Sequence, residues 1–134
     1  YPDPSLFVYG EDGLYTLSAS QAGLRIGFFP DIRFTHDCTT FIARDRAFAE
    51  TWKAYYYHRN LLKLYRAAAG LWFWPALGLI LPKWIWRIAR QPHARGRFAL
   101  IMALAIWDGL RGTTGRDHDR VLRLSNAQRV RILR

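Results

Sequence analysis

An uncharged run from Ala67 to Pro82 constrains the fold of this chain more than any other feature. As a helix its 16 residues would extend about 24 Å, whereas the hydrocarbon core of a bilayer is about 30 Å thick. Pro75 and Pro82 interrupt the run further because proline has no backbone N–H to donate. The run therefore does not predict a simple transmembrane helix.

A second apolar run, from Phe98 to Trp107, is shorter still. Tryptophan and cationic residues lie at the edges of both runs, and these residue types favour the headgroup region of a bilayer. They are Trp72, Trp74, Trp84, Trp86, Trp107, Arg87, Arg90, Arg95 and Arg97. The pattern favours amphipathic helices that lie in the membrane interface. Two alternatives stay open: a packed helical core, and a membrane-spanning hairpin of residues 71–88 and 98–110.

The net charge of +10 is unevenly distributed along the chain. Residues 1–58 contain 5 Lys and Arg against 7 Asp and Glu, whereas residues 59–134 contain 15 against 3. The basic half predicts an anionic partner, either a membrane surface or a nucleic acid. Because the arginines bracket apolar runs and form no polar face, we expect an anionic membrane surface and no nucleic acid.

Cysteine content and the start of the chain bear on its class. Cys38 is the only cysteine, which excludes an internal disulfide framework, and we interpret it as a small packed residue. The opening stretch, YPDPSLF, has no basic region and no long apolar region, so no signal peptide is predicted. We interpret the chain as beginning within a domain.

Short apolar and alternating segments at the start of the chain predict part of an α/β sheet. The expected order is strand, helix, strand and strand, over residues 5–10, 11–23, 24–30 and 31–37. Gly23 is a natural C-terminal cap for the first helix. A second, longer helix is predicted from Phe41 to about Ala69, where Gly70 would end it.

Four segments follow one another in an order that is found in a known family. They are SLFVYGED from Ser5, FFPDIRFTH from Phe28, YYYHRN from Tyr55 and DGLRGTTGR from Asp108. In this order they resemble the C-terminal half of family 2 glycosyltransferases of the GT-A fold, particularly bacterial rhamnosyl- and galactofuranosyltransferase-like enzymes of cell-surface glycan synthesis. The resemblance covers Asp3 to about Arg116. It implies an α/β fold in which residues 1–40 are the C-terminal part of a GT-A domain, residues 41–116 are amphipathic membrane-associating helices and residues 117–134 are a basic tail.

The resemblance also implies roles for three residues. Asp12 matches the general base, which takes the proton of an acceptor hydroxyl as its oxygen attacks the anomeric carbon of a nucleotide sugar. Glu11 is implied to bind the acceptor, and His36 to help hold a divalent metal, Mn²⁺ or Mg²⁺, on the donor diphosphate. Two positions depart from the family pattern, since Leu14 stands where an acid is common and Ser18 where an arginine is common.

The donor-binding half of the family, with its Asp-x-Asp motif, has no counterpart in this sequence. The expectation is therefore a fragment of a metal-assisted glycosyltransferase that is inactive alone. Its substrates would be a nucleotide-sugar donor and a glycan or lipid-linked acceptor, and it would act at the cytoplasmic face of the bacterial inner membrane as a peripheral or monotopic protein. The alternative is a basic helical module that anchors to a membrane or binds nucleic acid without catalysis.

Overall fold

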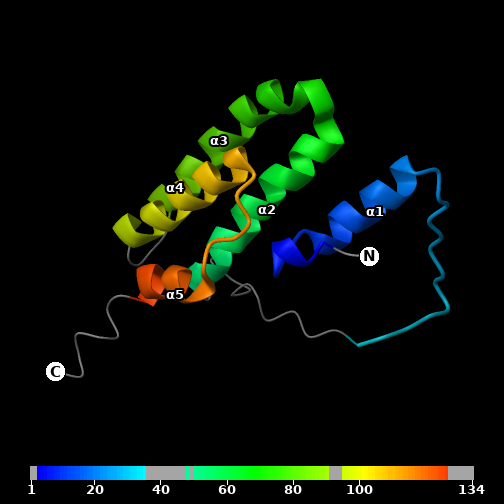
Figure 1. Cartoon of the computed structure of the whole chain (residues 1–134), viewed down its shortest axis with the longest axis horizontal. Coiled ribbons are helices and arrows are strands. Elements are labelled where there is room, and N and C mark those ends of the chain that lie inside the picture. Colours follow the sequence, from blue (N-terminus) through cyan, green and yellow to red (C-terminus); the bar gives the residue numbers. More distant parts are fainter. Residues whose placement is uncertain (1–2, 36–47, 49, 91–94, 127–134) are drawn as a thin grey trace.

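The computed structural model describes residues 3–35, 48, 50–90 and 95–126, and within these ranges the chain is mainly helical (Figure 1). Its elements, in chain order, are the 3-10 turn η1 Pro4–Leu6, α1 Glu11–Gln21, α2 Thr51–Ala69, the 3-10 turn η2 Gly70–Trp72, α3 Phe73–Ala89, α4 Arg95–Arg111 and α5 His118–Asn126. The prediction that the middle of the chain is helical is confirmed.

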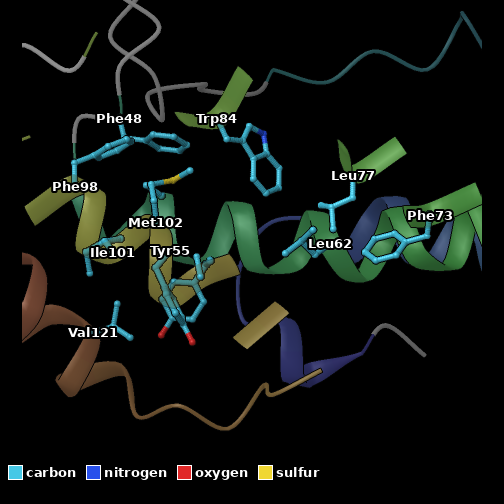
Figure 2. Packing of buried hydrophobic residues seen from close by; sticks show 13 residues of the cluster. Phe48, Tyr55, Leu62, Phe73, Leu77, Trp84, Phe98, Ile101, Met102 and Val121 are labelled. Atoms are coloured by element: carbon cyan, nitrogen blue, oxygen red, sulfur yellow. The ribbon is translucent and has the colours of Figure 1, made fainter. Parts of the chain in front are cut away.

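Helices α2 and α4 form the centre of the molecule, and α3 and α5 pack around them (Figure 1). The buried side of α4 carries Phe98, Ile101, Met102 and Ala105, whose spacing of three and four residues lines one face of a helix. Tyr55 of α2 belongs to the same buried cluster (Figure 2). Burial of this stripe holds α4 against α2, since an isolated helix of this length is only marginally stable in water.

The chain reverses direction at Gly70, whose φ of 52° lies in the left-handed region that favours glycine. Helix α3 then runs back along α2 (Figure 1). Phe73, Leu77 and Trp84 are its buried residues (Figure 2). The ring of Trp84 lies 4.7 Å from that of His58 on α2, so Trp84 belongs to the core and not to a lipid-facing edge.

By length and composition alone, one helical stretch in the described part of the chain is suited to cross a membrane. It is Thr51–Ala89, which comprises α2, η2 and α3. Of the most apolar 18-residue segment within this stretch, only 11% is buried inside the molecule. Because the reversal at Gly70 folds this stretch back on itself, it forms a hairpin whose exposed apolar side belongs to α3.

The structure contains no strand among the residues it describes, so the α/β prediction is wrong for them. Residues 5–10 form turns instead, because their carbonyl groups bind side chains of α2. Residues 25–35 make no backbone hydrogen bond to another described segment, so their alternating pattern lacks a strand to pair with. Cys38 and the last two residues of the strand predicted over residues 31–37 lie outside the described residues.

The helix predicted over residues 11–23 is confirmed, and the longer predicted helix is confirmed from Thr51 onward. At Phe48 and Glu50, which that prediction included, the described backbone is not helical. The helix predicted over residues 11–23 is α1, and Gly23 follows it with a φ of 81°. The longer predicted helix ends at Ala69, as expected, and α2 begins at Thr51. Residues 41–47, at the start of that prediction, lie outside the described part of the chain.

Candidate functional site

Helix α2 carries an unusual group of polar residues in the interior of the molecule. His58, Arg59 and Asn60 are each at most 2% exposed. A buried guanidinium or amide is costly unless its hydrogen-bonding groups have partners. Residues 5–9, before α1, and residues 108–116, at and beyond the end of α4, supply those partners. We call the resulting network the latch, and its polar side chains are Tyr55, Arg59, Asn60, Asp108 and Arg116.

Asn60 holds the turn that leads into α1. Its amide nitrogen Nδ2 lies 2.8 Å from the carbonyl oxygen of Leu6, 2.8 Å from that of Val8 and 2.7 Å from that of Tyr9. Its Oδ1 accepts a hydrogen bond of 2.8 Å from Nε of Arg59. Both ends of the amide are therefore used, and one side chain binds three carbonyl groups of the turn.

The clamped turn has a strained backbone. Phe7 has a φ of 63° and a ψ of −58°, and the N–H of Val8 donates to the carbonyl oxygen of Leu6 at 2.7 Å, which together define the rare positive-φ γ-turn. Tyr9 also has a positive φ, of 66°. Such conformations cost about 1–3 kcal/mol each in residues other than glycine. The hydrogen bonds from Asn60 offset this cost and keep the turn in one conformation.

Arg59 connects the same turn to the loop that precedes α5. Its Nη2 donates to the carbonyl oxygens of Ser5 and Leu6, both at 3.1 Å, and its Nη1 donates to that of Thr114 at 3.1 Å. Its guanidinium also lies over the ring of Tyr56, at 5.0 Å from the ring centroid. Carbonyl oxygens and a ring face thus stabilise the buried charge, because a guanidinium spreads its charge over a plane.

Asp108 closes the latch from the end of α4. It is 2% exposed and accepts hydrogen bonds from the hydroxyl of Tyr55 at 2.7 Å and from Nη2 of Arg116 at 2.8 Å. Burial acts to raise the pKa of Asp108, but the hydrogen bonds from Arg116 and Tyr55 outweigh it, so the pKa is lowered. Burial, together with the hydrogen bond to Asp108, raises the pKa of Tyr55 to about 12. At neutral pH the aspartate is therefore ionised and the tyrosine is a neutral donor.

Asp12 lies just beyond the clamped turn. It occupies the first turn of α1, two residues after Gly10, and its side chain is exposed. At Gly10, φ is 83° and an added Cβ would lie 3.3 Å from Cβ of Asn60, so glycine is favoured there. The latch therefore fixes the point at which α1 begins, and with it the position of Asp12.

Glu11 is the half-buried neighbour of Asp12. Its Oε2 is buried and has no hydrogen-bond partner in the described structure. A buried carboxylate oxygen without a partner is costly, so Glu11 is a polar group that the described packing leaves unsatisfied. Glu11 and Asp12 together offer one unsatisfied acceptor and one exposed carboxylate on a single turn.

The metal site expected at His36 lies outside the described residues, so its relation to Asp12 stays a prediction. Within the ranges that are described, no group of three or more His, Cys, Asp and Glu residues is placed to hold a metal ion. The two positions that depart from the family pattern lie on α1, where Leu14 is half-buried and Ser18 is exposed. Glu11 and Asp12 are thus the predicted site residues that the structure describes.

Sequence reasoning assigned no role to Arg59, Asn60 or Asp108, although all three lie in the segments YYYHRN and DGLRGTTGR. A signal for them was present. They occur on the core-facing sides of α2 and α4, and charged side chains are almost never fully buried unless they are paired. The sequence does not reveal the hydrogen-bond partners of Arg59 and Asn60. Both side chains bind mainly backbone carbonyl groups, which any residue can supply.

No family model, no curated protein and no solved structure matches this chain.

Proposed function

We propose that the chain is the helical, acceptor-side part of a glycosyltransferase of cell-envelope polysaccharide synthesis, with Asp12 as its general base. One observation carries the proposal. Residues 5–12, 55–60 and 108–116 are far apart in sequence and meet in the latch. They contain three of the four segments on which the resemblance to family 2 glycosyltransferases depends. Their meeting gives them one role in this proposal, which is to hold the turn that leads into α1 and Asp12.

In this proposal Asp12 takes the proton of an acceptor hydroxyl as that oxygen attacks the anomeric carbon of a nucleotide sugar. An ordinary ionised carboxylate suffices, because the hydroxyl becomes acidic only as the new bond forms. Glu11, with its unpartnered Oε2, accepts a hydrogen bond from another hydroxyl of the acceptor. A divalent metal, Mn²⁺ or Mg²⁺, with His36 among its ligands, would neutralise charge on the departing diphosphate.

The exposed segment that follows α1 supports the proposal that an α/β domain packs against this helical part of the enzyme. Leu24, Ile26 and Phe28 alternate along it and are 65%, 59% and 89% exposed. An extended apolar segment with free backbone groups is a template for pairing with a sheet edge. The proposal assigns that edge to the donor-binding half of a GT-A domain, outside residues 1–134. On this view the chain is inactive alone.

The test replaces Asp12 by Asn in the complete protein that contains these residues, with nucleotide sugars and a lipid-linked or glycan acceptor as substrates. Loss of a general base typically slows turnover by roughly 10²–10⁴-fold. Donor binding should stay near normal, because Asp12 acts on the acceptor. The matched control is Asp119→Asn, which removes an exposed acid from the first turn of another helix, α5. An Asp12→Asn enzyme that keeps more than half of the parent's activity would overturn the assignment.

A second candidate function is a basic membrane-anchoring module without catalysis. The exposed apolar side of α3 favours it over nucleic-acid binding, which needs a polar basic face. Under this alternative, Asp12→Asn changes nothing while binding to lipid vesicles persists. Both candidates involve a membrane surface, and the glycosyltransferase proposal places the chain at the cytoplasmic face of the bacterial inner membrane.

A further inference from the structure

Helix α3 (Figure 1) and the turn η2 before it leave several large apolar side chains uncovered in the described molecule. These residues, with their exposed fractions, are Leu71 95%, Trp72 75%, Trp74 63%, Leu79 73%, Ile85 62% and Trp86 57%. Soluble monomers rarely expose a contiguous apolar patch of this kind, and where they do, it usually marks an interaction surface. We call these residues the α3 face.

The α3 face has the geometry of a straight ridge. Trp72, Leu79 and Trp86 are seven residues apart, and seven residues bring a helix back to within about 20° of the same direction. At 1.5 Å per residue the ridge is about 21 Å long. Lys83 and Arg90, also seven residues apart and both exposed, follow one edge of it. The face is therefore an apolar ridge with a basic border.

The charge around the ridge has one sign. Residues 51–107 contain nine Lys and Arg and no Asp or Glu. Arginines also lie over the exposed tryptophans at both ends of α3. Arg66 is 5.9 Å from the ring centroid of Trp74, and Arg90 is 3.6 Å from that of Trp86. Indole rings with an adjacent cation suit the headgroup level of a bilayer, where one side is apolar and the other is wet and anionic.

We infer that the α3 face binds the surface of an anionic lipid bilayer, with the axis of α3 parallel to the membrane plane. Tryptophan–arginine pairs lie near both ends of α3, at Trp74 and Trp86, and they favour headgroup depth at both ends. The ridge between them is only about 21 Å long, shorter than the hydrocarbon core of about 30 Å, so both ends reach headgroup depth most readily when the helix lies along one surface. The sides of α3 that carry Phe73, Leu77 and Trp84 stay packed in the core and make no lipid contact. This inference deepens the second candidate function, membrane anchoring, by naming the surface that binds and its orientation. It does not depend on the proposed role of Asp12.

The test measures binding of the full chain to vesicles of phosphatidylcholine alone and of phosphatidylcholine with phosphatidylglycerol. The apolar variant is Trp72→Gln, Leu79→Gln and Trp86→Gln together. It should lower partitioning by at least roughly 100-fold, because three large side chains lose their burial. The matched control is Phe28→Gln, Ile32→Gln and Phe34→Gln, which removes three equally exposed apolar residues from another segment and should leave partitioning unchanged.

The charge variant, Lys83→Gln with Arg90→Gln, separates the two contributions to binding. It should weaken binding to anionic vesicles roughly 30-fold, since each cation near such a surface contributes roughly a fivefold step. Binding to neutral vesicles should change little, and salt should abolish the difference.

Several outcomes would overturn the inference. One is that the chain binds neither kind of vesicle, and another is that the control variant loses as much binding as the apolar variant. A third is that protease added outside sealed vesicles leaves a protected fragment covering α3 and α4, which would show a spanning hairpin. A fourth is that the parent is a dimer in solution and the apolar variant a monomer, which would show that a second copy covers the face. None of these readouts involves sugar transfer, so they stand apart from the test of Asp12.

Discussion

Asn60 shows how much of this molecule depends on single polar side chains. Its amide donates to the turn on one side and accepts from Arg59 on the other, so neither aspartate nor leucine can replace it without loss. Aspartate has no N–H to donate, and leucine would leave three carbonyl groups and a guanidinium with fewer partners. The identity of this residue therefore follows from its hydrogen bonds and not from its size.

His58 makes stability depend on pH, and this gives a prediction at the same scale. The residue is 0% exposed, its Nδ1 is hydrogen-bonded to the carbonyl of Ala54 at 2.7 Å, and its Nε2 has no partner in the described structure. Burial lowers its pKa from 6.5 to about 4. Between these values the unfolded chain binds a proton that the folded chain does not. Stability should therefore fall by about 3 kcal/mol as the pH falls from 6.5 to about 4.

Urea unfolding across this pH range measures the effect. His58→Gln should remove most of the pH dependence, even if it also lowers stability at neutral pH. The control is His118→Gln, which changes a half-exposed histidine. If the parent and His58→Gln lose equal stability on acidification, the effect belongs to other groups.

At the scale of elements, the crossing of α2 and α4 depends on Gly109. A Cβ added there would lie 2.7 Å from Cδ1 of Leu62 and 2.9 Å from the backbone oxygen of Arg59. The second contact cannot be relieved by rotating a side chain, so α2 and α4 would have to move apart. Because Arg59 belongs to the latch, a shift of α2 here also disturbs the turn before Asp12.

We predict that Gly109→Ala lowers the free energy of unfolding by about 1–3 kcal/mol, the usual cost of overpacking a core. Gly96→Ala is the matched control on the same helix. An added Cβ at Gly96 meets no atom within 4 Å, so this change should be neutral or stabilising by up to about 1 kcal/mol. Thermal unfolding of both variants decides the matter, and a Gly109→Ala protein as stable as Gly96→Ala would contradict the close crossing.

The sequence predicted the positions of the helices better than it predicted which distant segments contact one another. The helix at Glu11, the end of the longer helix at Ala69 and the exposed tryptophans of α3 follow from local caps and apolar spacing, which lie within a few residues of one another. Residues 5–10 were predicted to be a strand, because their apolar composition outweighed any signal of a turn. The turn exists because Asn60, some fifty residues away, binds its carbonyl groups, and such a contact has no local pattern.

For the whole molecule, α2 separates the two surfaces to which we assign functions. Helices α1 and α3 both pack on α2, and Figure 1 shows them on opposite sides of it. With the α3 face on a bilayer, Asp12 would stand away from the lipid by about two helix diameters, roughly 20 Å, because α3 and α2 both lie between them. An acceptor would then reach Asp12 through sugar units that extend beyond the headgroups. This arrangement favours a glycan that is already attached to its lipid carrier.

The most direct test of the central claim, that the latch positions Asp12 as a general base, is a double-mutant cycle on kcat in the complete protein. Asn60→Ala alone should lower kcat by roughly 10–100-fold, because a misplaced base loses its alignment with the acceptor. In an Asp12→Asn background the same Asn60→Ala change should cost little further activity, since residues that act as a unit are not additive. If the two losses instead multiply, Asn60 acts independently of Asp12, and the account of the latch is wrong.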